Sequence, residues 1–315
     1  HAFNSGFWNE NSNSVAVSKN GEVAHALGAE LWAYVPMNLL PHLQWLALPE
    51  YAHVYYVDGE PRSYDVNIFD SGVDANGINH INGWGTILVV GMRFGGGKIE
   101  VDSDGNGSVD KVLRSAYMVF DITDPEQPPV LLGEFSRDNL GFTSSTPGLV
   151  KKRQPSASGD WSRPVFNSWK LVLGSGSDAD QLSSIQSSQN ARLFEIDLRD
   201  LVTTPAAVLT EPVVANTAGI DLGVATSFTG DLLSVDWNGD LLDDAAYFGI
   251  VGGDELAPTG RMMRRHYTGT YSGSQSTLLN TTQAFVTAPL SLIDGDNRRW
   301  LFFGSGRLFS REDLS

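Results

Sequence analysis

The sequence contains no cysteine, and no apolar run in it approaches the ~20 residues that a membrane-spanning helix needs. The missing cysteine excludes structural disulfides and thiolate metal sites. It leaves the compartment open, because extracellular bacterial proteins often fold without disulfides. The missing apolar run predicts a chain that does not insert into a membrane.

Positive charge is scarce as well. The chain has 21 Lys and Arg residues against 37 Asp and Glu residues, which gives a formal net charge of −16 at pH 7. A surface of this sign repels phosphate backbones and anionic lipids, so nucleic acid is excluded as a main partner. Clustered carboxylates instead favour cations, above all calcium.

Familiar catalytic signatures are also missing. The sequence has no HExxH, GxSxG or GxGxxG motif, and its histidines are not paired at zinc-ligand spacing. We interpret His53 and His80 as buried, hydrogen-bonded side chains rather than as metal ligands or bases. The sequence therefore predicts no enzyme site.

Strand-forming runs are abundant. They are short, rich in Val, Ile, Tyr, Phe and Trp, and closed by Gly, Asp or Pro, which is typical of an all-β protein. The runs occupy residues 30–36, 53–59, 84–92, 115–122, 169–176, 191–198, 231–237, 244–253 and 299–307. Short strands separated by acidic turns fit a β-propeller better than a sandwich. At about 40–50 residues per blade the chain would form six or seven blades, and its long loops argue for fewer.

A few segments do not follow the strand pattern. Residues 38–51 predict one helix, in which Leu43, Trp45 and Leu46 pack inward. Residues 136–163 and 177–190 are rich in Ser, Gly, Asn and Gln and predict exposed loops. Residues 203–219 predict a further connection.

Two acidic stretches share one spacing. The first loop, "DSDGNGSVD" (102–110), offers the side chains of Asp102, Asp104, Asn106 and Asp110 and the backbone carbonyl of Ser108. Alternate side chains of a tightly curled loop point inward, so these oxygens can surround one calcium ion. Position 12 of an EF-hand would be Leu113, so the loop follows a shorter, nine-residue design closed by Asp110.

The second loop, "DWNGDLLDD" (236–244), repeats the spacing with Asp236, Asn238, Asp240 and Asp244. It departs from the first loop at its sixth position, where Leu241 replaces a glycine. We expect this change to strain the curl and weaken the site. The alternative is that both stretches are simply Asx-Gly turns between strands. The stretch "IDGDNRR" (293–299) has fewer carboxylates and is interpreted as such a turn.

Several segments resemble, in the same order, the carboxy-terminal propeller domain of PilY-type type IV pilus tip proteins. They are "HAFN" (1–4), "ELWAYVPMNLLPHLQWLALPEYAHVYYVDGEP" (30–61), "GWGTILVVGMRFGGG" (83–97), "MVFDITDPEQP" (118–128) and "FFGSGR" (302–307). The resemblance covers most of the chain, and only about residues 136–225 are non-diagnostic. It implies a modified β-propeller related to quinoprotein dehydrogenases, with short helical insertions. Residues 1–315 would form this single domain, incomplete at both ends and without the family's variable amino-terminal region.

The resemblance also implies a function. The family carries a nine-residue calcium loop late in the domain, and its ligand positions match Asp236, Asn238, Asp240, the carbonyl of Leu242, and Asp244. The implied role is a non-enzymatic, calcium-binding pilus tip protein that supports pilus extension and surface adhesion. Its partners would be minor pilins and a host or abiotic surface, and its place the pilus tip outside the cell, after export through the outer membrane. The first loop falls where family members vary, so its calcium role rests on the oxygen ligands alone.

Two other functions stay open at this point. A quinoprotein-like oxidoreductase is suggested by the related fold, although the adjacent cysteines that such enzymes often use are missing. A carbohydrate-binding propeller would need exposed aromatic side chains, for which Trp161 and Trp237 are candidates.

Overall fold

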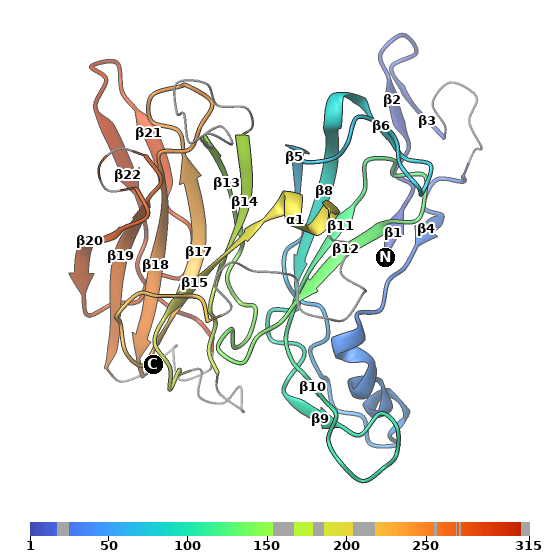
Figure 1. Ribbon diagram of the computed structural model, residues 1–315, viewed down its shortest axis with the longest axis horizontal. Helices are drawn as coiled ribbons and strands as arrows, with labels where there is room; N and C mark the ends of the chain where they lie inside the picture. The colour runs from blue at the N-terminus through green and yellow to red at the C-terminus, as the bar shows by residue number, and fades with distance from the viewer. Residues whose placement is uncertain are drawn as a thin grey trace.

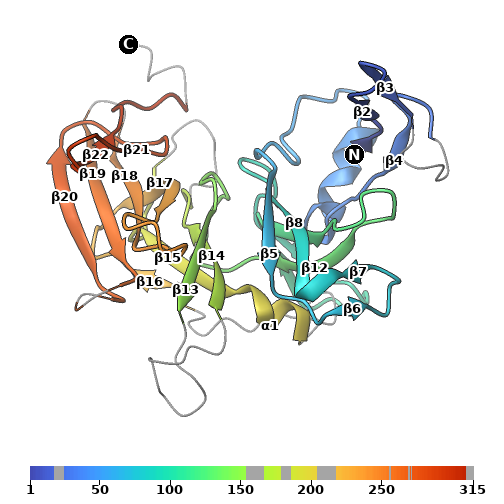
Figure 2. The same cartoon turned by 90° about the horizontal axis from the view of Figure 1, so that it is seen from above.

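The computed structural model describes residues 1–17, 25–153, 167–178, 186–203, 218–254, 257–268, 270 and 272–309. Three four-stranded antiparallel sheets follow one another along the chain (Figure 1). They stand side by side when seen from above (Figure 2). The chain is mostly β, as expected, with three short helical segments among the described residues. No helix within the described residues has the length and apolarity needed to cross a membrane.

The first sheet has the order β12-β11-β8-β5, so its strands pair with their neighbours along the chain. Its strands are β5 (Arg62–Asn67), β8 (Trp84–Gly91), β11 (Tyr117–Asp121) and β12 (Val130–Phe135). Buried and less buried residues alternate along β8, because successive side chains of a strand point to opposite faces. Two hairpins are inserted between these strands: β6 (Gly72–Val73) with β7 (Asn79–His80), and β9 (Ile99–Val101) with β10 (Lys111–Leu113).

The second and third sheets are uninterrupted meanders with the orders β13-β14-β15-β16 and β17-β18-β19-β20. The strands of the second are β13 (Gly148–Arg153), β14 (Asn167–Gly174), β15 (Arg192–Asp197) and β16 (Ile220–Asp221). Those of the third are β17 (Ser227–Val235), β18 (Ala245–Gly253), β19 (Pro258–His266) and β20 (Gln275–Thr281). Nearly every residue of β18 is buried, since other elements cover both faces of this strand.

Smaller elements flank the three sheets. The remaining two-stranded pairs are β1 (Ala2–Phe3) with β4 (Glu30–Trp32), β2 (Phe7–Asn9) with β3 (Ser14–Ala16), and β21 (Leu290–Ile293) with β22 (Arg299–Phe302). The helical segments are the 3₁₀ helices η1 (Met37–Ala47) and η2 (Ile81–Gly83) and the short α-helix α1 (Leu198–Thr203).

The core consists of apolar layers between successive sheets. Ile87 and Val119 of the first sheet meet Leu171 and Leu173 of the second in one cluster. Val172, the residue between the last two, points the other way and packs in a second cluster with side chains of the third sheet such as Phe248. The second sheet therefore buries both faces, as an inner propeller blade does.

The predicted helix at 38–51 forms as the 3₁₀ helix η1, and its packing face differs from the prediction. Leu43 and Leu46 are exposed, whereas Leu39 and His42 are buried. The reason is Pro41, which has no N–H to donate and breaks an α-helical ladder. A 3₁₀ helix aligns residues three apart, so positions 39, 42 and 45 share the inner face.

Two other predictions are wrong. Residues 53–59 form no strand, and His53 is exposed rather than buried. The predicted loop at 136–163 contains β13, whose Val150 is fully buried, and the buried Leu140. The apolar signal of β13 is only Leu149 and Val150, which is too short to indicate a strand without its pairing to β14. Much of the predicted connections lies outside the described residues, namely 154–166, 179–185 and 204–217.

Candidate metal centre

The first loop connects β9 to β10 and projects at the lower edge of the molecule (Figure 1). The carboxylate of Asp102 accepts the N–H groups of Gly105 and Gly107, each at 2.7 Å. At the other end, the carboxylate of Asp110 accepts the N–H of Ser103 at 3.0 Å. The first and last acidic residues therefore hold the loop in one curl.

The second loop connects β17 to β18 and has the same hydrogen-bond pattern. Asp236 accepts the N–H groups of Gly239 at 2.8 Å and Leu241 at 2.7 Å. Asp244 accepts the N–H of Trp237 at 2.9 Å. A strand follows each loop directly, at position 111 and at position 245, as expected for the nine-residue design.

The middle side chains of both loops also turn inward. Asn106 accepts the N–H of Ser108 at 2.8 Å, and Asp240 accepts that of Leu242 at 2.9 Å at the equivalent position. In the first loop the amide of Asn106 further donates to Asp104 at 2.9 Å. The amide of Asn238 donates to Asp240 at 3.3 Å in the second loop. Each predicted set of ligands thus lies on one hydrogen-bonded turn, but within the described residues the acidic side chains of neither loop bring three ligand atoms within 4.8 Å of one another. Calcium binding by these sets stays a prediction.

The backbone conformation of Leu241 has the strain that the sequence predicts for the second loop. Its φ is +67°, and Gly107 at the equivalent position of the first loop has a φ of +87°. This left-handed region suits glycine and is unfavourable for a residue with a Cβ. The Leu241 side chain is 75% exposed, so little burial compensates for the strain.

The backbone amides also act on the charge of the loops. The N–H of Gly107, foremost among several donors, lowers the pKa of Asp102. Burial raises the pKa of Asp236, but the N–H groups of Gly239 and Leu241 more than offset it and leave the pKa below its usual value. Both carboxylates are therefore anionic near neutral pH, which is the state that binds a cation.

The second loop is anchored to neighbouring strands. Asp243 donates its N–H to the carbonyl of Lys151 in β13 at 2.9 Å and accepts the Lys151 N–H at 2.7 Å. The Thr268 hydroxyl, just beyond β19, donates to Asp244 at 2.7 Å. Within the described residues, the side-chain hydrogen bonds of the first loop stay inside that loop. Of the two loops, the second is therefore the one that links the second and third sheets.

Trp237 is buried, which corrects the prediction of an exposed sugar-stacking surface. Its side chain is 7% exposed and packs with Val235, Ala245 and Tyr247. The indole Nε1–H donates to the Tyr247 hydroxyl at 2.9 Å. Trp161 lies outside the described residues. The stretch 293–299 forms the predicted turn, between β21 and β22.

A third group of potential ligands was missed by sequence reasoning. Asp74, His80 and Asp121 bring one carboxylate or imidazole atom each within 4.8 Å of one another. His80 is buried, as predicted, but its Nε2 atom lies near two carboxylates, one six residues before it and one 41 residues after it. No sequence spacing signals such a group, because the pairing of β11 with β8 creates it.

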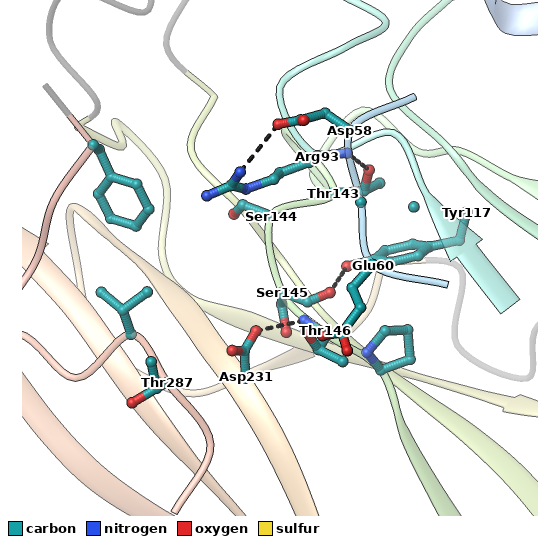
Figure 3. A pocket seen from close by; sticks show the side chains of 15 residues that line it. Asp58, Glu60, Arg93, Tyr117, Thr143, Ser144, Ser145, Thr146, Asp231 and Thr287 are labelled. Carbon is teal, nitrogen blue, oxygen red and sulfur yellow. Dashed lines mark hydrogen bonds and ion pairs between the residues drawn. The ribbon is translucent and has the colours of Figure 1, made fainter. Parts of the chain in front are cut away.

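A pocket of about 270 Å³ lies where the starts of the three sheets approach one another. Its lining includes Asp58 and Glu60 before β5 and Asp231 in β17 (Figure 3). Arg93 is already paired with Asp58 at 3.0 Å. Three carboxylates against one guanidinium disfavour the acidic quinone that an oxidoreductase of the quinoprotein type would hold.

The chain is similar to two proteins of Xylella fastidiosa, each described as a type IV pilus biogenesis factor PilY1 homolog. One is 27% identical over 316 residues, a match that covers 95% of this chain and 20% of the relative. The other is 25% identical over 337 residues, which covers 98% of this chain and 19% of the relative. The expected resemblance to PilY-type proteins is confirmed. The chain spans about a fifth of the length of these relatives.

The fold is similar to that of the Pseudomonas aeruginosa PilY1 C-terminal domain, for which a crystal structure is known. The superposition has a TM-score of 0.50 at 19% identity and covers 91% of this chain and 50% of the PilY1 chain. The PilY1 domain has a propeller-like fold, so the propeller-like arrangement of the three sheets is supported. No family model matches the chain.

Proposed function

We propose that this chain is a calcium-binding, non-enzymatic module of a type IV pilus tip protein that supports pilus assembly, extension and surface adhesion. The similarity to PilY1 homologues in X. fastidiosa supports the pilus role. The second loop carries the proposal for calcium, because its ligand spacing matches that of the first loop and its hydrogen bonds place it at a junction of sheets. The ligands are Asp236, Asn238, Asp240, the Leu242 carbonyl and Asp244, with a second set at Asp102, Asp104, Asn106, the Ser108 carbonyl and Asp110.

Calcium at the second loop acts as a conformational clamp. Asp236, Asp240, Asp243 and Asp244 place four acidic groups within nine residues, and their repulsion opposes the curl. A bound calcium ion offsets that repulsion and fixes the loop between β17 and β18. Since Asp243 and Asp244 also contact β13 and the end of β19, the ion tightens the contact between neighbouring sheets.

The proposed setting is the cell surface. Residues 1–315 form one propeller-like domain that is exported through the outer membrane and displayed at the pilus tip. Minor pilins lie beneath it, and a host or abiotic surface lies beyond it. A carbohydrate-binding role is disfavoured by the burial of Trp237. An oxidoreductase role is disfavoured by the acidic pocket at Asp58, Glu60 and Asp231.

Substitutions at Asp240 test the clamp. Asp240→Ala removes a ligand from an exposed loop, so we expect it to abolish calcium binding there and leave the sheets folded. Asp240→Lys places an ammonium among the carboxylates and should partly reproduce the bound state without an ion. Isothermal titration measures binding, and pilus display and twitching measure function in cells that carry each full-length variant.

The matched control is Asn106→Ala, which changes the equivalent position of the first loop. We expect this variant to lose the first site and to keep pilus display near the wild-type level. Equal pilus display by wild type, Asp240→Ala and Asp240→Lys would reject the clamp. Wild-type protein that takes up no calcium would reject both loops as sites.

A further inference from the structure

Three side chains of the first sheet converge outside both acidic loops. Asp74 lies in the turn between β6 and β7, His80 is the last residue of β7, and Asp121 is the last residue of β11. The Nε2 atom of His80 is 3.3 Å from Oδ2 of Asp121 and 3.8 Å from Oδ2 of Asp74. Two carboxylate oxygens thus lie close to one imidazole nitrogen.

The group is buried and its parts are held in place. His80 is 1% exposed and Asp121 is 2% exposed. The ring of Phe69 stacks on the imidazole with 3.8 Å between centroids and 6° between planes. Oδ1 of Asp121 accepts the Thr123 N–H at 2.9 Å and the Thr123 hydroxyl at 2.6 Å. Its other oxygen, Oδ2, is the one that faces His80.

Asp74 is oriented in the same way. Its Oδ1 accepts the N–H groups of Asn76 at 2.9 Å and Ile78 at 2.8 Å, which leaves Oδ2 toward His80. The side-chain amide of Asn76 donates a hydrogen bond to Oδ2 of Asp74 at 3.1 Å. Each carboxylate therefore has one oxygen fixed by donors and the other turned to the imidazole, the arrangement that surrounding groups impose on metal ligands. The Asp74 side chain is 29% exposed, so this side of the group is open to solvent.

His80 lacks the hydrogen bonds that a buried imidazole requires. Neither Nδ1 nor Nε2 has a hydrogen-bond partner among the described residues, although two carboxylates lie near Nε2. A protonated imidazole would need an acceptor at both nitrogens, and would still leave one net negative charge in the group. A neutral imidazole with a divalent cation between the three residues leaves no net charge, which lowers the cost of burial.

The distances fit a shared ion. Two ligand atoms that are each ~2.1 Å from one zinc ion at a tetrahedral angle lie about 3.4 Å apart. The two measured separations from His80 Nε2, 3.3 and 3.8 Å, are close to this value. One imidazole nitrogen with two carboxylate oxygens is a donor set for zinc and related transition metals, whereas calcium takes oxygen ligands.

We propose that Asp74, His80 and Asp121 form a binding site for a divalent transition metal of the zinc type. The ion joins the turn between β6 and β7 to the end of β11. The open side at Asp74 leaves a fourth position for water, as in zinc sites with three protein ligands. The site stabilises the inserted hairpin against the first sheet and is separate from the calcium loops.

The test is zinc binding to the full 315-residue chain in saturating calcium, which occupies the acidic loops. We expect isothermal titration to give a single Zn²⁺ site in the wild type. Asp74→Asn keeps the acceptor for the turn but loses the charge, and should weaken this binding at least about tenfold. Asp124→Asn is the matched control, because Asp124 forms a similar turn with Glu126 and lies outside the group. It should leave zinc affinity unchanged.

Two further measurements keep the test independent of folding defects. Co²⁺ bound to the wild-type chain should give the visible absorption of a four-coordinate nitrogen and oxygen site, and Zn²⁺ should displace it. His80→Gln should lose this spectrum while keeping the far-ultraviolet circular dichroism of the wild type. Equal zinc affinity in wild type and Asp74→Asn, or no visible Co²⁺ spectrum in the wild type, would overturn the proposal and leave the group as a buried ion pair.

Discussion

Replacing Leu241 by glycine should strengthen the second loop. Leu241 has a φ of +67° in the curl, a conformation that costs a residue with a Cβ about 1–2 kcal/mol. Glycine removes that strain but has more freedom in the unfolded chain, which costs about 0.5–1 kcal/mol. The exposed side chain contributes little burial. We therefore expect a net gain of about 0.5–1 kcal/mol in the curled state.

This gain should appear in calcium affinity, because the ion binds only the curled loop. A difference of about 1 kcal/mol corresponds to roughly a fivefold lower Kd. Isothermal titration on a chain whose first loop is inactivated by Asn106→Ala isolates the second site. Leu241→Ala is the control for side-chain size: it keeps the Cβ and the strain, so its Kd should match the wild type.

The reverse substitution in the first loop completes the test. A Cβ added at Gly107 meets no atom within 4 Å, so Gly107→Ala changes backbone preference alone at a φ of +87°. It should weaken the first site by about 1 kcal/mol. Identical effects of Leu241→Gly and Leu241→Ala, or an unchanged first site in Gly107→Ala, would refute backbone strain as the cause.

Three further predictions concern stability. Burial raises the pKa of Asp231. Stability is therefore lost as pH rises from the usual carboxyl pKa to the raised pKa, because the buried carboxyl must ionise. Asp231→Asn removes this cost, so it should raise Tm at about pH 7 and not at about pH 3.5. Trp237→Phe leaves the Tyr247 hydroxyl without its indole donor and should lower the free energy of unfolding in urea by about 1–3 kcal/mol. Chelation of calcium should lower the Tm of the wild type and should lower the Tm of Asp236→Asn much less. Differential scanning calorimetry measures both Tm values.

The sequence predicts most of the central strands and few of the edge strands, and it misses the central strand β19. β8, β11, β14 and β18 carry runs of apolar and aromatic residues, because neighbouring strands and sheets cover them. β13 has two apolar residues followed by lysines, and its place is decided by pairing with β14 and by packing against β17. Such tertiary contacts leave little trace in the local pattern.

The candidate sites also differ in how well the sequence alone reveals them. The ligands of each acidic loop lie within nine residues, so their spacing can be recognised in the sequence itself. Asp121 comes 41 residues after His80. Only the antiparallel pairing of β11 with β8 brings the end of β11, where Asp121 lies, beside the start of β8, which follows His80. Trp237 is a further case, since its burial depends on Tyr247 in the next strand.

The two acidic loops share one spacing, but ion binding acts on different parts of the fold in each. The first loop closes a two-stranded hairpin, and its side-chain hydrogen bonds within the described residues stay inside the loop, so ion binding there acts on that hairpin. The second loop shares hydrogen bonds with Lys151 of the second sheet and with Thr268 beyond β19. Binding and sheet contact are then linked, and each must strengthen the other by the same free energy. A substitution in β13 that loosens Lys151 should therefore weaken calcium binding without touching a ligand.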